Sequence, residues 1–279
     1  MAGVTIKLFL PKGDAQSLRT AELVNWTGKA LAGPRSQLDD LLTREELSKS
    51  GVYILLGVDP DTGKQAAYIG EAEIVRDRLK QHRDKEFWIH AIAFVSKDEN
   101  LTKSHIRYLE GRLIEEAQKV ARFKVLNGQS SGSRLPESDR EDMEVFLGRI
   151  AQLLPVLGCE LLTPILDTVS GGAKLRLTGK IKGTTAHGQR TAKGFVVYSG
   201  SEAVVTLRPS APSYIIEARE ELKREGTLVI DDDKLRFSRD TEFSSPSMAG
   251  AIVCGGHVNG LAFWRDKDGR ELKEIEGEA

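Results

Sequence analysis

The residue best suited to chemistry in this sequence is Glu110, which lies on the apolar side of a predicted helix. The apolar positions of TKSHIRYLEGRLIEEAQKV form one stripe: Ile106, Leu109, Leu113, Ile114, Ala117 and Val120. At about 100° per residue, Glu110 projects near the centre of this stripe. A carboxylate there is costly unless it pairs with a cation or binds a metal. Two interpretations stay open, a metal ligand and a structural ion pair with Arg78.

Four other side chains precede Glu110 at spacings that point to one crevice. Arg78 and His82 are four residues apart in EAEIVRDRLKQH and therefore share a helix face, either as a solvated pair or as part of a site. Tyr53 and Tyr68 lie on successive predicted strands, where tyrosines are usually core aromatics. Their hydroxyls reach one pocket if both rings lie on the same face of the sheet. Asn127 precedes a glycine, which by itself indicates a turn.

The elements that must position these residues follow from their periodicity. GVYILLGV and QAAYIG are two β-prone runs joined by turn formers at 59–63, so they predict a hairpin. A helical pattern follows across 71–83, and WIHAIAFVS predicts a third strand. Thr102 and Ser104 are suited to cap a long helix that continues to about residue 122. The predicted order over 50–128 is therefore β-β-α-β-α.

The order and spacing of these residues resemble those of the GIY-YIG nuclease domain. The resemblance rests on Gly51-Val52-Tyr53, Tyr68-Ile69-Gly70, Arg78, His82, Glu110 and Asn127, together with the order of the elements. It covers about 50–128, and valine replaces the central isoleucine of the family's first tripeptide.

The resemblance implies a metal-dependent endonuclease that hydrolyses phosphodiester bonds in duplex or structured DNA. Glu110 would then hold a single Mg²⁺ (or Mn²⁺), and Arg78 would supply a second positive charge to the phosphate. One tyrosine hydroxyl would orient or deprotonate the attacking water, and both Tyr53 and Tyr68 are candidates. We assign the base role to Tyr53 and a positioning role to Tyr68, and His82 would shuttle a proton or contact phosphate.

Other functions remain open beside this one. The chain could be a catalytically silent nucleic-acid-binding or regulatory protein, or an RNA-directed nuclease. Cutting both strands of a duplex with one site requires two events or two subunits, so a homodimer is also open.

The remaining sequence predicts a mixed α/β (α+β) protein. Residues 1–49 read as an N-terminal extension with a strand at 4–10, a helix-like stretch near 15–25 and a short helix at 43–48. The nuclease-like domain occupies 50–128, and 129–169 reads as a Gly/Ser-rich linker followed by a helix from about 138 to 154. A strand-rich α+β domain is predicted at 170–279.

The C-terminal part carries a second resemblance and a basic segment. Residues after about 235 are similar to an uncharacterised domain that is found fused to such nucleases in bacteria, most clearly over SPSMAGAIVCGGHVNGLAFWRDKDG. The final GLAFWRDKDGREL predicts a hairpin. The net charge of the chain is −1, yet no acid occurs between residues 167 and 202. This segment is either a solvated sheet face or a nucleic-acid-binding surface. Its cations are Lys174, Arg176, Lys180, Lys182, Arg190 and Lys193.

The overall composition places limits on compartment and cofactor. Only Cys159 and Cys254 are present, which excludes a disulfide framework and a thiolate zinc site and favours a reducing, cytoplasmic setting. No stretch approaches the roughly 18 apolar residues of a membrane span, so we expect no membrane association.

Overall fold

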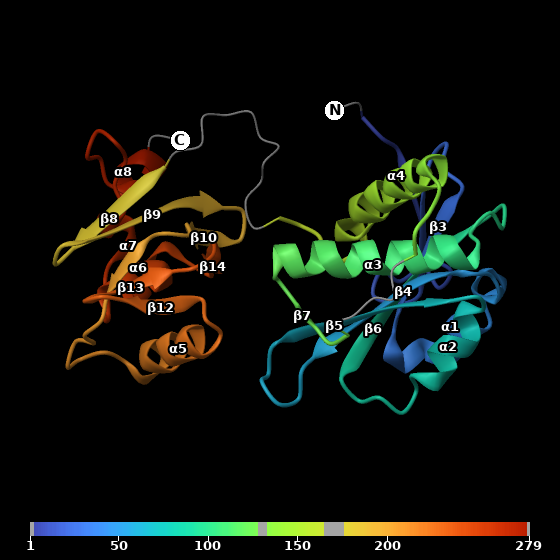
Figure 1. Ribbon diagram of the computed structural model, residues 1–279, viewed down its shortest axis with the longest axis horizontal. Helices are drawn as coiled ribbons and strands as arrows, with labels where there is room; N and C mark the ends of the chain where they lie inside the picture. Colours follow the sequence, from blue (N-terminus) through green and yellow to red (C-terminus); the bar gives the residue numbers. More distant parts are fainter. Residues whose placement is uncertain (1–2, 128–132, 165–175, 278–279) are drawn as a thin grey trace. The chain divides into compact units, whose positions relative to one another are not determined.

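The computed structural model describes residues 3–127, 133–164 and 176–277 (Figure 1). The chain divides into two compact units, an N-terminal unit at Met1–Thr163 and a C-terminal unit at Pro164–Ala279. Both units combine helices with sheets, which confirms the predicted α+β class. The predicted basic residue Lys174 lies outside the described residues.

The N-terminal unit is built on a sheet of seven strands in the order β1-β2-β3-β6-β4-β5-β7. All neighbouring strands are antiparallel except β5 and β7, which are parallel. The strands are β1 (Ile6–Phe9), β2 (Arg19–Leu23), β3 (Gly28–Pro34), β4 (Gly51–Val58), β5 (Gln65–Ala72), β6 (Trp88–Ser96) and β7 (Lys124–Val125).

Helices cover both faces of this sheet (Figure 1). One face packs on the two long helices, α3 (Lys103–Val120) and α4 (Glu137–Leu153), and the other packs on α1 (Leu38–Leu42) and α2 (Val75–Gln81). Three short 3₁₀ helices complete the unit: η1 (Arg35–Gln37), η2 (Glu45–Ser48) and η3 (Pro155–Leu157). The order β4-β5-α2-β6-α3 agrees with the order expected from the sequence.

The alternation of the hairpin strands assigns each side chain to a face. Val52 and Ile54 on β4 contribute to the core under α3 and α4, whereas Tyr53 and Leu55 contribute to the core under α1 and α2. The connection between β4 and β5 is held by Asp59, whose backbone N–H donates to Lys64 and whose carbonyl accepts from Gly63. This loop fixes the register of the two strands.

Helix α3 carries Glu110 and is fixed at both ends. The Thr102 hydroxyl accepts a hydrogen bond from the backbone N–H of His105, and the Thr102 backbone N–H in turn donates to Nδ1 of His105 at 3.3 Å. The helix ends at Ala121, which adopts the left-handed conformation with φ 55°. None of the described helices combines the length and apolar character that crossing a bilayer requires.

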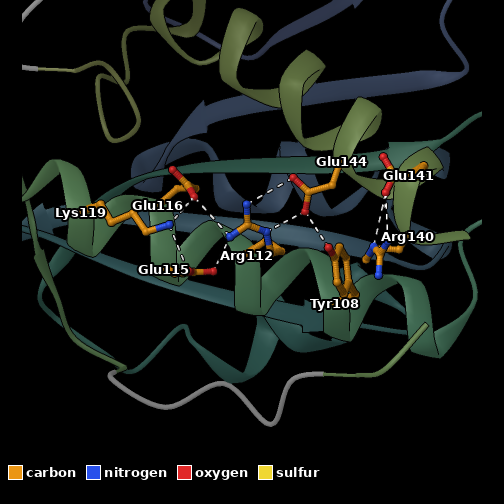
Figure 2. Close-up of polar contacts among 8 residues, drawn as sticks. All are labelled: Tyr108, Arg112, Glu115, Glu116, Lys119, Arg140, Glu141 and Glu144. Carbon is orange, nitrogen blue, oxygen red and sulfur yellow. Dashed lines mark hydrogen bonds and ion pairs between the residues drawn. The ribbon is translucent and has the colours of Figure 1, made fainter. Parts of the chain in front are cut away.

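A polar network joins α3 to α4, and Figure 2 shows Glu144 between Tyr108 and Arg112. The Glu144 carboxylate accepts hydrogen bonds from the Tyr108 hydroxyl and the Arg112 Nε, both at 2.6 Å. Arg112 also pairs with Glu116 at 3.2 Å. The hydrogen bond from Arg112 is the main cause that lowers the pKa of Glu144. The network fixes the side of α3 that faces away from the sheet.

The stretch around 15–25 is a strand, which corrects the prediction of a helix. Its residues have good helix propensity, but β2 pairs on both sides, with β1 through Ala21–Leu8 and with β3 through Ala21–Ala30. The region before residue 50 therefore supplies three strands of the main sheet. Helix α4 likewise packs its buried residues into the core of the N-terminal unit.

The C-terminal unit contains two smaller sheets, with strand orders β14-β10-β9-β8 and β11-β13-β12. The strands are β8 (Leu177–Ile181), β9 (Thr184–Thr191), β10 (Gly194–Val197), β11 (Glu202–Val204), β12 (Leu228–Asp231), β13 (Lys234–Phe237) and β14 (Thr241–Phe243). The helices are α5 (Ser213–Arg224), α6 (Pro246–Cys254), α7 (Gly260–Phe263) and α8 (Leu272–Gly277).

Helix α6 is the central helix of this unit. Ser245 caps it by accepting from the Met248 N–H, and Pro246 occupies its first turn. Trp264 is fully buried and donates its indole N–H to the Pro246 carbonyl at 3.0 Å. The predicted final hairpin is wrong in its first half: the segment after Asn259 forms α7, and only an isolated bridge from Arg265 to Glu271 remains.

Replacing Glu144 with alanine removes the acceptor shared by Tyr108 and Arg112. We expect the free energy of unfolding to fall by about 1–2 kcal/mol, because hydrogen bonds to a charged group are lost at a half-buried position. Glu141→Ala on the same helix is the matched control, since Glu141 is exposed and bonds only to its neighbour Arg140. Urea unfolding of both variants measures the difference, and equal stabilities would contradict the role of the network.

Candidate functional site

The aromatic part of the candidate site lies on the α1/α2 face of the β4–β5 hairpin. Tyr53 is opposite Gly70 and Tyr68 is opposite Leu55, so both tyrosines project from one face. Their ring centroids are 6.2 Å apart, with an interplanar angle of 25°. His82 follows α2, and its ring centroid is 4.9 Å from that of Tyr68 and 5.5 Å from that of Tyr53.

The glycines of both tripeptides have packing reasons to lack a side chain. A Cβ on Gly70 would overlap the phenol ring and hydroxyl of Tyr53. A Cβ on Gly51 would overlap the backbone carbonyl of Phe94 on the neighbouring strand β6. The Tyr53 ring therefore packs directly against the backbone of Gly70, in the space that a side chain would otherwise fill.

Tyr53 is the innermost member of the cluster, with no exposed surface. Its hydroxyl lies 2.8 Å from Nε2 of His82. Burial raises the pKa of Tyr53, Tyr68 raises it further, and the nearby Arg78 guanidinium opposes the rise. A buried phenol with a raised pKa is poorly suited to take a proton from water, which disfavours the base role expected for Tyr53.

His82 is held on two sides and is 2% exposed. Its ring contacts the Tyr53 hydroxyl, and its carbonyl accepts the indole N–H of Trp88 at 2.9 Å. The other ring nitrogen, Nδ1, is buried and has no hydrogen-bond partner among the residues that the structure describes. Burial, followed by the positive charges of Lys85 and Arg78, lowers the pKa of His82 to about 4. The imidazole is therefore neutral at physiological pH.

Arg78 links the aromatic cluster to the acid. It lies on α2, is exposed, and donates to the Gln81 side chain at 2.8 Å. Interaction with the Tyr53 phenol is the largest cause that raises the pKa of Arg78, and Tyr68 adds to it. The pKa of Glu110 is raised by burial, and the charge of the same guanidinium opposes this rise. One cation thus acts on both phenols and on the carboxylate.

Glu110 is half-buried and comes from α3, on the opposite face of the sheet from the tyrosines. Burial raises the pKa of Glu110, and the negative charge of Glu71 raises it further, while a hydrogen bond from the Glu71 backbone opposes the rise. This places the carboxylate at the end of β5, directly after the second tripeptide. In the described part of the chain, no cation forms an ion pair with Glu110, which disfavours the ion-pair interpretation.

Asn127 extends the pairing of β7 with β5. Its side-chain Oδ1 accepts from the Ile69 N–H at 3.0 Å, and its Nδ2 donates to the Ile69 carbonyl. The preceding Leu126 N–H donates to Ala67 at 2.9 Å. The asparagine side chain therefore makes the two hydrogen bonds that a paired strand residue would make, and it holds the strand that carries Tyr68.

The donor chemistry at Glu110 suits a magnesium or manganese ion. Its carboxylate and that of Glu71 are hard oxygen donors, and their mutual repulsion would be relieved by a divalent cation. Within the three described ranges, no group of three or more histidine, cysteine or acidic residues forms a metal site. Mg²⁺ commonly takes one or two carboxylates and keeps several waters, so Glu110 and Glu71 are the residues that would hold it.

The structure brings the rings of Tyr53, Tyr68 and His82 together, with Arg78 on the adjacent helix α2. Glu110 approaches the end of the same strand at Glu71, from the other face of the sheet. The side chain of Asn127 binds the backbone of Ile69 on the same strand. Two neighbours were not predicted, Glu71 and Lys85. The Lys85 ammonium lies over the Tyr68 ring, 4.6 Å from its centroid. Glu71 follows Gly70 directly, so its position next to the second tripeptide was a sequence signal that it belongs to the site.

Part of the basic segment lies on one face of β8 in the C-terminal unit. Leu177 packs into the core, and the alternation turns Arg176 and Lys180 the other way. The Arg176 guanidinium lies over the Tyr198 ring, 5.9 Å from its centroid. Burial, then Arg176 and Lys180, lower the pKa of His187 on the adjacent strand. This face therefore gathers two cations, an imidazole and an aromatic ring.

The other predicted cations lie elsewhere in that unit. Lys182 has φ 45° and, with Gly183 at φ 78°, forms the two-residue turn between β8 and β9. Arg190 pairs with Glu276 at 3.0 Å, so its charge is already compensated. Lys193 lies in the turn between β9 and β10. The predicted nucleic-acid-binding residues that the structure describes are therefore not one patch.

Replacing Gly70 with alanine tests whether the Tyr53 ring needs the space above this glycine. The added methyl group must displace the phenol from His82, and we expect the free energy of unfolding to fall by about 1–3 kcal/mol. Gly148→Ala is the control, because its Cβ meets no atom and alanine favours a helix, which should stabilise by about 0.5–1 kcal/mol. Chemical denaturation measures both, and a neutral Gly70→Ala would show that the phenol does not need this space.

The stability of the N-terminal unit should fall as the pH drops because of His82. Below an unfolded pKa of about 6.5 the unfolded chain takes up a proton on this imidazole, whereas the folded chain resists until about pH 4. His82→Phe removes this proton uptake, so its loss of stability between about pH 7.5 and about pH 5 should be smaller than that of the wild type. Amide hydrogen exchange in β4 reports this unit alone, and equal losses would place the imidazole in water.

Comparison with known proteins gives one match. Residues 177–276 match a family model described as Domain of unknown function (DUF4357). No curated protein and no solved structure matches the chain. The expected similarity of the C-terminal part to an uncharacterised domain is therefore confirmed, and the similarity begins at β8 rather than near residue 235. The C-terminal unit is similar to this family over nearly all of its described length.

Proposed function

We propose that the N-terminal unit is a metal-dependent nuclease of the GIY-YIG kind that hydrolyses phosphodiester bonds in DNA. The observation that carries this proposal is the packing of Tyr53, Tyr68 and His82 near the end of β5, with ring centroids 4.9–6.2 Å apart, next to Arg78 on α2. A guanidinium suits the planar arrangement of phosphate oxygens. A carboxylate and a phenol beside it supply a site for a cation and a contact for water.

The two tyrosines take different roles in this proposal. Tyr68 is half-buried and is the phenol that can contact the attacking water. Tyr53 is enclosed and bonded to His82, so it positions the cluster rather than meeting the substrate. His82 is itself enclosed, and its lowered pKa makes it a weak base. Its role is to hold Tyr53 in place.

The remaining side chains handle charge. Arg78 binds the non-bridging oxygens of the scissile phosphate, and Lys85 adds a second cation on the side of Tyr68. Glu110, helped by Glu71, would hold the Mg²⁺ or Mn²⁺. When bound, the ion supplies charge neutralisation at the phosphate and at the leaving oxygen. Asn127 holds β5 and thereby fixes Tyr68 relative to Glu71.

The C-terminal unit is proposed to contact DNA or a protein partner. The β8 face with Arg176 and Lys180 supports this role, because exposed cations beside an aromatic ring suit a phosphate backbone and its bases. The similarity to a domain of unknown function neither adds to this role nor opposes it.

A plasmid-nicking assay with and without Mg²⁺ tests the proposal on the full chain. Glu110→Gln and Arg78→Ala should each reduce nicking by about a hundredfold or more, because both remove charge stabilisation from the transition state. Glu115→Gln is the matched control, since Glu115 lies on the same helix, is 52% exposed and pairs with Arg112 and Lys119, neither of which belongs to the candidate site. Thermal unfolding of each variant separates lost chemistry from lost fold.

The outcomes also distinguish the competing functions. Nicking that persists in folded Glu110→Gln would overturn the assigned site. Binding to DNA without any metal-dependent cleavage would favour a catalytically silent nucleic-acid-binding protein. Preferred cleavage of single-stranded RNA in competition with duplex DNA would make the chain an RNA-directed nuclease.

A further inference from the structure

A cavity in the N-terminal unit lies at the turn end of the β4–β5 hairpin, away from Gly51 and Gly70. It has a volume of about 300 Å³ and is lined by residues near Gly57, Gln65 and Gly158. Tyr53, Gly70 and Glu110 do not line it, so it is separate from the candidate nuclease site. Its volume is at the lower end of the range for small-molecule pockets.

One cation dominates this cavity, the guanidinium of Arg19 on β2. Arg19 is opposite Ala32 on β3, and this small neighbour lets the long side chain cross β3 and reach β6. Its Nη2 donates to the Leu157 carbonyl at 3.1 Å and lies 3.2 Å from Nε2 of His90. Arg19 is half-buried, and this burial lowers the pKa of its guanidinium.

The charge of Arg19 has no compensating acid in the cavity. No aspartate or glutamate lines it, and the described residues provide no ion pair for Arg19. Because arginine only donates, His90 must accept through Nε2 and is neutral. Burial, then the charge of Arg19, lower the pKa of His90 to about 4, consistent with this state. Arg19 Nε is buried and also has no hydrogen-bond partner within the described ranges.

The walls around the guanidinium are mostly apolar. Leu56 and Leu157 are core residues, Phe123 is half-buried against the core, and Ile89 is 65% exposed at the rim. Apolar walls that surround a single uncompensated cation complement a small molecule with one negative charge and an apolar body. A compact inorganic anion would use the charge and leave the walls uncovered.

We propose that this cavity binds a small organic monoanion, whose carboxylate contacts Arg19 and whose apolar body packs between Phe123 and Ile89. The inference does not depend on the proposed nuclease activity. It assigns to the N-terminal unit a ligand site distinct from the Tyr68–Glu110 end of the sheet.

Isothermal titration calorimetry of the full chain tests this site with three probes. Benzoate carries both the charge and the apolar body, benzamide lacks the charge, and inorganic phosphate lacks the apolar body. We expect benzoate to bind with one-to-one stoichiometry and at least about tenfold more tightly than either of the others, as expected for loss of a charged hydrogen bond or of buried apolar area.

Two variants locate the binding. Arg19→Gln should reduce benzoate affinity about tenfold and remove its advantage over benzamide. Ile89→Asp keeps the interior intact and places a negative charge at the rim, so it should weaken benzoate by about threefold or more. Val145→Asp is the matched control, because Val145 is 61% exposed on α4 and does not line the cavity, and it should leave the affinity unchanged.

The proposal fails if benzoate does not bind, or if benzamide or phosphate binds as tightly as benzoate. It also fails if folded Ile89→Asp binds benzoate like the wild type. Should Arg19→Gln not fold, the comparison of Ile89→Asp with Val145→Asp still decides the location. DNA nicking is measured in parallel, and its presence or absence does not bear on this result.

Discussion

The contact between the Tyr53 ring and Gly70 is the constraint on which the candidate site depends. Because residue 70 has no side chain, the phenol lies flat against β5 and its hydroxyl reaches His82. That hydrogen bond fixes the end of α2, and α2 carries Arg78 at the rim. The position of the exposed Arg78 is thus set by the fully enclosed Tyr53 ring. The residue that meets solvent is therefore different from the residues that hold it in place.

The sheet also serves as a partition between the acid and the phenols. The tyrosines lie on the α1/α2 face, and Glu110 projects from α3 on the other face. They approach each other only where β5 ends, at Gly70 and Glu71. The network of Arg112 and Glu144 on the outer side of α3 matters for this reason: it limits sliding or rotation of the helix that would withdraw the carboxylate from that end.

Much of the architecture between 51 and 120 could be predicted, since period-2 and period-3.6 patterns there are clear and local. The strand β2 could not be predicted. Arginine, alanine, glutamate and leucine in this stretch favour a helix, and only the pairing with β1 and β3 makes it a strand. At the site, the residue types and their order were evident in the sequence. The register that faces Tyr53 with Gly70 depends on the loop at Asp59, and the enclosure of Tyr53 depends on α2 and the segment before β4. Neither is local, so the burial that disfavours Tyr53 as a base could not be foreseen.

The pairing of Asn127 and β7 with β5 has a consequence for the solubility of the chain. A strand at the border of a sheet offers unpaired amide groups to other molecules and invites aggregation. Here Lys124, Val125 and the Asn127 amide occupy such groups along β5 from Ala66 to Ile69. A two-residue strand and one side chain therefore shield the border that would otherwise be free to recruit a second molecule by sheet extension.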